Sequence, residues 1–357
     1  MQKNIKGRGS QQNLPNRFEK VYIDTSEVYE EYSDEEDRKI ETVFFKDNSK
    51  SILIKNDSPD LGAGYSINPY RGCEHGCVYC YARPTHEYLG FSSGLDFETK
   101  IMVKHEAPAL LVKEFSKKSW IPQPVFFSGN TDCYQPVEKK LEITRKCLGV
   151  FLNFRNPVAV ITKNALVQRD IDILKELSKL DLVRVVISIT TLKKELQRKM
   201  EPRTSSPLKR LQTIKFLSSN GIPTAVNVAP IIPGLTDEEI PEILRLASDN
   251  GAKHAGRVVL RLPHSVKELF SGWLRKEFPD RADKILNRIK ELRGGKLYDS
   301  NFGTRLTGEG IWADTIKNLF ESNCRKYGLN TEKSPMQLNL FKVPEKLKND
   351  DQYDIFG

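Results

Sequence analysis

Three cysteines close together in the sequence are the residues of this chain best suited to chemistry. Cys73, Cys77 and Cys80 are spaced C-x3-C-x2-C within the string GCEHGCVYCYAR at 72–83. Cysteine sulfur is a soft anionic ligand, and short loops let the backbone curl around a metal centre. A zinc site usually has paired CxxC knuckles or a CxxC followed by two histidines, and the chain has no second pair. An iron–sulfur cubane normally takes four cysteines, so three would leave one iron open to a substrate or cofactor.

A structural zinc site is the second interpretation of the same cysteines. His75 or His86 would then supply the fourth ligand. The protein would be a zinc-stabilised nucleic-acid-binding protein without catalysis, with its basic surface as the functional part. An α/β domain of the size predicted below needs no zinc in order to fold, however, and its polar strand-end residues would have no role.

The cysteine motif resembles that of the radical S-adenosylmethionine (SAM) enzymes, in which C-x3-C-x-Y-C follows a short strand. The longer string GCEHGCVYCYARPTHEYLG at 72–90 is similar to a subgroup related to spore photoproduct lyase, in a bacterial branch of it. The resemblance covers about 62–304. It implies a [4Fe-4S] cluster held by Cys73, Cys77 and Cys80, whose fourth iron binds the amino and carboxylate groups of SAM. It also implies an electron donor such as flavodoxin or ferredoxin, and cleavage of SAM to methionine and a 5′-deoxyadenosyl radical.

The region from 62 to 264 alternates apolar runs with amphipathic segments, which predicts a parallel sheet built of βα units. Helices are expected at 107–118 and 207–220, and Gly221 is placed to end the second. Six βα units fit an incomplete (β/α)6 barrel of the α/β class, which the resemblance also implies. The six strands are predicted at 65–70, 125–129, 158–162, 183–189, 224–230 and 257–262.

The two ends of the chain differ from this core. Residues 1–61 are predicted to be an N-terminal extension that is partly disordered: the first twenty are polar and expected to be mobile, and 27–37 form an acidic, solvated run. Two short strands or a hairpin are expected around 41–47 and 51–57. Residues 265–340 are predicted to be a helical C-terminal region, and 341–357 a polar tail. The helices there are expected at 265–278, 283–293 and 311–327.

Ligands of barrels and open α/β sheets bind at the carboxyl ends of the strands. Ser128, Gly129 and Asn130 follow the second strand, where radical SAM enzymes hold the SAM amino group through backbone carbonyls. Lys163 ends the third strand, and the resemblance assigns it to the SAM carboxylate, with which it can form an ion pair.

The later strand ends offer further SAM contacts. Ser188 and Thr190 present hydroxyls suited to the ribose. Arg203 would assist with the carboxylate or fix its loop by an ion pair. The rigid, apolar 229–234 segment would stack on adenine, and Arg261 and His264 end the sixth strand at the same rim.

Tyrosines flank the third cysteine of the motif. Tyr79 stands where the superfamily has an aromatic ring near adenine, and with Tyr81 it forms the YCY string of spore photoproduct lyases, which use tyrosines to return a hydrogen atom. Cys133 lies a few residues beyond the position of the hydrogen-donating cysteine in those lyases. It is therefore interpreted either as a thiyl donor or as a small buried thiol.

The composition of the chain indicates which partners and which cellular location to expect. The net charge is +9, from 56 basic and 47 acidic residues, which weakly favours an anionic partner. Carbon–carbon cleavage of a nucleic acid lesion is the first substrate hypothesis, and tRNA, a protein or a small metabolite remain alternatives. No apolar run is long enough to cross a membrane and no signal peptide is recognised, so a cytoplasmic protein is expected. Cys133, Cys147 and Cys324 are dispersed and form no disulfide framework.

Overall fold

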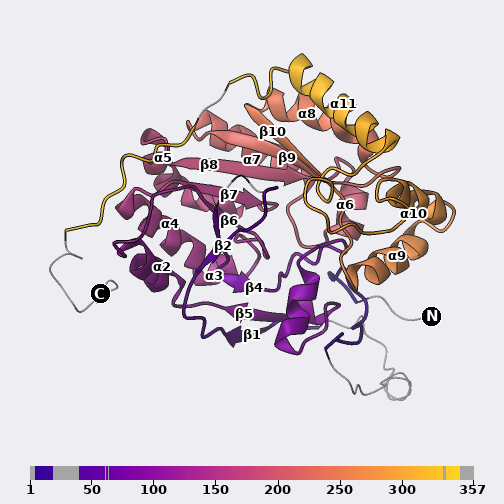
Figure 1. Cartoon of the computed structure of the whole chain (residues 1–357), viewed down its shortest axis with the longest axis horizontal. Coiled ribbons are helices and arrows are strands. Elements are labelled where there is room, and N and C mark those ends of the chain that lie inside the picture. Colours follow the sequence, from indigo (N-terminus) through magenta and orange to yellow (C-terminus); the bar gives the residue numbers. More distant parts are fainter. Residues whose placement is uncertain (1–4, 19–39, 61, 63, 333–334, 346–357) are drawn as a thin grey trace.

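The computed structural model describes residues 5–18, 40–60, 62, 64–332 and 335–345. The acidic run at 27–37 and most of the predicted tail lie outside these residues. The described chain is built around a seven-stranded sheet in the order β10-β9-β8-β7-β6-β3-β2 (Figure 1). Its strands are β2 Leu53–Lys55, β3 Tyr65–Ile67, β6 Val125–Phe127, β7 Val158–Thr162, β8 Val183–Ile189, β9 Thr224–Ile231 and β10 His254–Val259.

Six of these strands, from β3 to β10, are parallel neighbours and correspond to the six predicted strands. Only β2 runs antiparallel, at the edge beside β3. Because β2 and β10 are not paired with each other, the sheet stays open, as expected of an incomplete barrel. The parallel strands all end at one rim, and this rim is where ligands of such sheets bind.

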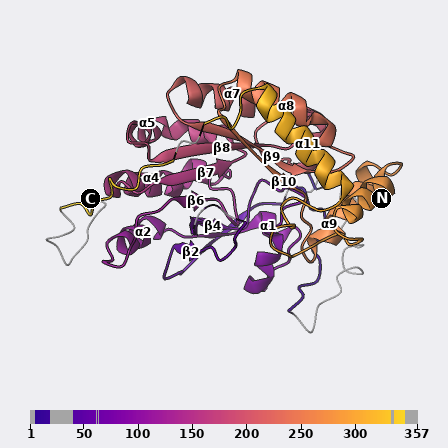
Figure 2. The same ribbon diagram turned by 45° about the horizontal axis from the view of Figure 1, so that its top comes forward.

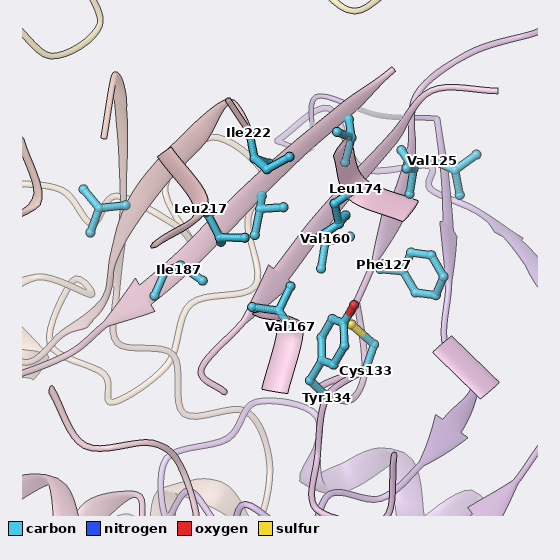
Figure 3. Close-up of a cluster of buried hydrophobic side chains, with 14 of the residues drawn as sticks. Val125, Phe127, Cys133, Tyr134, Val160, Val167, Leu174, Ile187, Leu217 and Ile222 are labelled. Atoms are coloured by element: carbon cyan, nitrogen blue, oxygen red, sulfur yellow. The ribbon is translucent and has the colours of Figure 1, made fainter. Parts of the chain in front are cut away.

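Amphipathic helices cover the outer face of the sheet. Figure 2 shows α5, α7, α8 and α11 along the side of β8 to β10. Their buried residues join a large apolar core with the strands; part of it, including Phe127, Val160, Leu174 and Leu217, is drawn in Figure 3. The helices over this sheet are α2 Ala107–Phe115, α3 Glu138–Leu141, α4 Ile143–Phe154, α5 Ile171–Lys179, α7 Pro207–Ser219, α8 Ile240–Asp249 and α11 Ile311–Lys326. The helix α6 Lys194–Met200 instead packs Leu196 and Met200 into a second core.

The second core joins the C-terminal helices α9 Val266–Glu277 and α10 Ala282–Glu291 to the cysteine loop. Val78 and Tyr79 of the loop belong to the same buried cluster as Phe270 of α9 and Ile285 of α10. The predicted helical C-terminal region is therefore present, and part of it supports the loop directly. Among the described residues, none of the helices has the length and apolar character needed to cross a membrane.

The main differences from the predicted elements lie in the first hundred residues. The two N-terminal strands form no hairpin: β1 Val43–Lys46 pairs with β5 Lys100–Val103, in a separate sheet of order β1-β5-β4. The predicted first strand is divided into β3 and β4 Tyr70–Arg71, with Pro69, which lacks an amide hydrogen, between them. The short helices are η1 Arg83–Leu89, α1 Asp96–Thr99, η2 Ala165–Asp170 and η3 Asp237–Glu239.

Candidate cluster and SAM site

The cysteine loop begins directly after β4 and is bent by two glycines. Gly72 has φ +80° and Gly76 has φ +66°, the left-handed region that side chains disfavour. Cys73 and Cys77 are buried and Cys80 is half-buried. The amide of Cys73 donates to the carbonyl of Phe97 at 2.9 Å, and that of Cys80 to the carbonyl of Cys77 at 3.2 Å. The loop thus presents three thiols from a backbone that is itself fixed.

Burial changes the acidity of these thiols. It raises the pKa of Cys73 to about 12, and it raises the pKa values of Cys77 and Cys80 as well. A metal centre that binds thiolates supplies the positive charge that displaces their protons. The donor set therefore fits an iron–sulfur cluster, and the cluster would hold the loop together in turn.

The geometry does not support the zinc alternative. Within the part of the chain that the structure describes, no group of three or more His, Cys, Asp and Glu side chains is gathered closely enough to hold one metal ion. A zinc ion needs its ligands around a single point, whereas a cubane spreads three cysteines over three irons. His75 contacts Asp132 through Nδ1 (3.5 Å) and Asn164 through Nε2 (3.1 Å), and His86 is bonded to the Lys100 carbonyl at 2.8 Å.

Glu74 anchors the beginning of the loop. Its carboxylate accepts a hydrogen bond from the amide of Val137 at 2.7 Å, and its own amide donates to the Gln135 side chain at 2.9 Å. Arg203 pairs with Glu74 at 3.2 Å, and the Arg203 amide donates to the carbonyl of His75 at 3.3 Å. Of the two roles expected for Arg203, the structure therefore contains the ion pair that fixes the loop.

Residues 5–18, which we call the N-terminal strap, cover the cysteine loop. The amides of Gly9 and Ser10 donate to the carboxylate of Glu98 at 2.9 and 2.7 Å. The same carboxylate pairs with Arg83, whose Nε donates to the carbonyl of Cys77 at 3.0 Å. The expectation that the first twenty residues are mobile is therefore wrong for the strap, because buried polar contacts hold it in place.

The segment after β6 is shaped by a residue that the sequence analysis missed. Asn68 accepts hydrogen bonds from the amides of Gly129 and Asn130 at 2.8 and 2.9 Å, and Ser128 has φ 77°. The carbonyl of Gly129 accepts a hydrogen bond from the phenol of Tyr81. The expected SAM-amino segment thus lies beside the cysteine loop, where a backbone carbonyl meets the tyrosine after the third cysteine.

Glu201 is a second missed residue and lies at the centre of a buried network. Its carboxylate accepts hydrogen bonds from the phenol of Tyr79, from Thr190 at 2.7 Å and from Arg210. Burial alone would raise the pKa of Glu201, but Arg210 and Lys163 outweigh it and hold the pKa at about 2. Glu201 is therefore an anion that orients Tyr79.

The two hydroxyls expected at the ribose are placed differently. Thr190 is fully buried and bonded to Glu201 and to the carbonyl of Ala229 at 2.8 Å, so its hydroxyl already serves the Tyr79 network. Ser188 is buried one residue before the end of β8, and its carbonyl accepts from Arg210 at 3.0 Å. Because the Thr190 hydroxyl is already engaged, Ser188 is the more suitable of the two for binding a ligand.

Lys163 joins several strand ends. Its amide donates to Asp132 at 2.8 Å. Its Nζ lies 3.5 Å from the carbonyl of Ala229, two residues before the end of β9, and 5.9 Å from the centre of the Tyr79 ring. No carboxylate pairs with Lys163 among the described residues. Its ammonium group can therefore pair with an incoming carboxylate.

Arg261 and His264, the two residues predicted at the end of the sixth strand, lie in different surroundings. The guanidinium carbon of Arg261 lies 5.2 Å from the centre of the Tyr81 ring, so this side chain reaches the site. His264 is exposed, with φ 48°, and Arg17 and Glu87 are its charged neighbours. Within the described part of the chain, its side chain contacts neither the cysteine loop nor the strand-end groups above.

Cys133 adjoins the Ser128 segment: its amide donates a hydrogen bond to the Ser128 hydroxyl at 3.0 Å, and that hydroxyl also contacts its thiol. Its side chain is fully buried in the main apolar core, beside Tyr134 and near Phe127 in Figure 3, whereas the loop cysteines belong to other clusters. Burial raises the pKa of the Cys133 thiol well above its usual range. The structure therefore places Lys163 against Tyr79 and Tyr81 against Gly129, and it buries the Cys133 thiol in the core next to the Ser128 segment.

Proteins of bacteria and of an archaeon are similar to this chain in sequence. Uncharacterized proteins of Mycobacterium tuberculosis and Mycobacterium bovis are 35% identical over 246 residues, which is 68% of this chain and 71% of each relative. A protein of Methanocaldococcus jannaschii is 33% identical over 199 residues, 54% of this chain and 72% of the relative.

Solved structures of spore photoproduct lyase share the fold. The complex with dinucleoside spore photoproduct has 16% sequence identity and a TM-score of 0.58, and the alignment covers 81% of this chain and 80% of the lyase. A variant of the lyase with bound AdoMet and the dinucleoside gives the same values. The family model of the radical SAM superfamily matches residues 67–247, which include the cysteine loop and the strand ends from β6 to β9. With this match over half of its length, the chain belongs to the radical SAM superfamily.

Proposed function

We propose that Cys73, Cys77 and Cys80 hold a [4Fe-4S] cluster and that the enzyme cleaves SAM reductively to a 5′-deoxyadenosyl radical, which abstracts a hydrogen atom from the substrate. One observation carries this proposal: three thiols on a fixed, buried loop lie at the rim beside a lysine that has no carboxylate partner among the described residues. When bound, the cluster supplies one electron to the sulfonium of SAM. The electron would come from a donor such as flavodoxin or ferredoxin.

The chain's own residues would bind and orient SAM. Lys163 would pair with its carboxylate, and carbonyls of the Ser128, Gly129 and Asn130 segment would accept from its amino group. For the Gly129 carbonyl this requires Tyr81 to give up its hydrogen bond. Ser188 would bind the ribose, and the ring of Tyr79, held by Glu201, would limit the position of adenine.

Nucleic acid is the substrate class that we propose, with a reaction of the photoproduct lyase kind. The support is the positive charge of the chain, the guanidinium of Arg261 at the rim, and the fold shared with a lyase whose structure contains a dinucleoside photoproduct. In such a reaction Tyr81, which is 45% exposed, is the tyrosine best placed to contact the substrate.

The test is anaerobic reconstitution with iron and sulfide, reduction, and chromatographic detection of 5′-deoxyadenosine formed from added SAM. Wild-type protein is expected to form it, and Cys77→Ser is expected to form none. Cys147→Ala is the matched control, because it removes a buried thiol of α4 outside the loop. SAM cleavage by Cys77→Ser at the wild-type rate, or loading of zinc alone, would overturn the proposal.

Lys163→Met tests the SAM contacts separately from the cluster. Iron content is expected to stay at the wild-type level because Lys163 is no ligand. SAM affinity is expected to fall at least about tenfold, as for loss of a charge-assisted hydrogen bond. Unchanged SAM affinity in this variant would remove Lys163 from the proposed site.

A further inference from the structure

Two guanidinium groups, that of Arg261 just after β10 and that of Arg293 just after α10, have no carboxylate partner among the described residues. Nη2 of Arg293 donates to the carbonyl of Leu260 at 2.8 Å, the residue directly before Arg261. Arg293 is only 3% exposed. Burial lowers its pKa, and the neighbouring positive charge of Arg261 lowers it further. Neither arginine forms an ion pair with any residue that the structure describes.

The hydrogen bonds of the two side chains are also incomplete. Arg293 uses Nη1 on the carbonyl of Thr304 at 2.9 Å and Nη2 on Leu260, but its Nε is buried without a partner. The Nε of Arg261 is buried without a partner as well. A buried donor without an acceptor destabilises the fold, and the cost is larger when the donor belongs to a charged group. Two such donors on neighbouring cations therefore call for an acceptor that carries negative charge.

The acidic residues near Arg261 and Arg293 do not supply this negatively charged acceptor. Asp60 is engaged by Arg305 at 2.6 Å and by the amide of Gly303 at 2.8 Å. Asp299 accepts from the hydroxyl of Thr304 at 2.5 Å and from the amide of Asn301 at 2.9 Å. Asp299 and Glu309 raise the pKa of Arg293 through space without pairing with it. The acceptor must therefore come from outside the described chain.

Arg261 connects these unpartnered guanidinium donors to the candidate site. Its guanidinium carbon lies 5.2 Å from the centre of the Tyr81 ring, and the Tyr81 phenol reaches the Gly129 carbonyl after β6. A guanidinium stacked on an aromatic face keeps its edge available for hydrogen bonds. An anion bound at this edge would lie beside the residue that follows the third cysteine.

We propose that Arg261 and Arg293 bind a phosphate-type oxyanion of the substrate beside Tyr81. The planar fork of the Arg261 guanidinium matches two oxygens of a phosphate or phosphodiester. Arg293, whose two Nη atoms are engaged by carbonyls, would add its Nε. This inference rests on the proposed function and deepens it, because it names the chemical group that would hold the substrate next to the radical. A phosphodiester of nucleic acid and the phosphate of a small molecule share this chemistry.

Binding to the reconstituted full-length protein tests the inference by calorimetry with inorganic phosphate, the dinucleotide thymidylyl-thymidine and sodium acetate. Wild-type protein is expected to bind phosphate and the dinucleotide, and Arg261→Ala to weaken both at least about tenfold. Arg261→Lys should recover only part of the affinity, because an ammonium cannot form the two-pronged contact. Tighter dinucleotide than phosphate binding would assign a phosphodiester, and the reverse a phosphomonoester.

Arg257→Ala is the matched control. Arg257 lies on β10 itself, stacks on Phe320 at 5.7 Å, and also has a buried nitrogen without a partner, but it does not contact Tyr81. It should bind the probes like wild type. Absence of phosphate and dinucleotide binding, equal losses in Arg257→Ala, or no loss in Arg261→Ala would overturn the site, and a preference for acetate would overturn the phosphate class. Because binding needs neither SAM nor a reductant, its failure is distinct from a failure of SAM cleavage.

Discussion

Gly9 of the N-terminal strap lies against the carbonyl oxygen of Gly76 in the cysteine loop, so closely that a β-carbon at residue 9 would be 1.7 Å from that oxygen. A β-carbon at Gly94 would similarly lie 2.2 Å from the carbonyl oxygen of Gln12 in the strap. Both partners are backbone atoms, which cannot rotate away as the end of a side chain can. The strap therefore fits against the loop, and against the segment around Gly94, only because these two positions are glycine.

The first prediction is that Gly9→Ala impairs cluster assembly. The new methyl group must displace either the strap or the backbone at Gly76, between Cys73 and Cys77. We expect less iron and sulfide per chain after anaerobic reconstitution, and faster bleaching of the visible absorption in air. Gly149→Ala in α4 is the control, because a β-carbon there meets nothing within 4 Å. Iron content and bleaching equal to the control would mean that the strap is not part of the cluster site.

The second prediction concerns Glu98, which is fully buried and binds both the strap and Arg83. Glu98→Gln leaves the buried Arg83 guanidinium without its counter-charge, so we expect the free energy of unfolding to fall by about 3 to 5 kcal/mol. Denaturant unfolding measures this loss. Glu114→Gln removes the surface pair with Lys117 and should cost less than about 1 kcal/mol. A loss of that small size for Glu98→Gln would show that the strap contributes little to the fold.

The sequence predicted the parallel sheet well because the signal of each strand is local. A run such as 183–189 is apolar enough to be recognised as a buried strand by itself, and it is β8 in the structure. β5 was missed since it has only four residues directly after a helical turn, and its partner β1 is more than fifty residues away. Local patterns do not identify such a partner.

The buried polar residues that hold the site in place were not predicted, for a related reason. Glu98 and Gly9 are 89 residues apart, and Glu201 and Tyr79 are 122 apart, so nothing in a single sequence connects them. Their types gave a weak signal only: a lone glutamate in a polar stretch looks like solvated surface. In the folded protein, segments that are distant in the sequence bury each glutamate and supply its partners. Only the fold shows which segments these are.

The third prediction is a pH dependence that belongs to Glu201. Its pKa in the folded protein, about 2, is below the value of about 4.3 for an unfolded chain. Its contribution is therefore complete above the unfolded pKa and is lost as the pH falls from about 4.3 to about 2. We expect about 3 kcal/mol from this group.

The difference in unfolding free energy between wild type and Glu201→Gln, measured on iron-free protein, isolates this contribution from the other carboxylates. It should be largest near neutral pH and shrink through that window. Glu195→Gln, an exposed glutamate of α6, is the control and should show no such change. A difference that stays constant from pH 6 to pH 2 would contradict the ion pair of Glu201 with Arg210.

The fourth prediction distinguishes the two roles considered for Cys133. A thiol that returns a hydrogen atom must reach the substrate, whereas the Cys133 thiol lies in the apolar core, and burial raises its pKa. We therefore expect alkylation of the iron-free native protein to label the half-buried Cys80 first and to spare Cys133 and Cys147 until unfolding, as mapped by mass spectrometry. Cys133→Ala should lower the free energy of unfolding by about 1 kcal/mol. Labelling of Cys133 as fast as Cys80 would instead place this thiol within reach of the site and restore the hydrogen-donor interpretation.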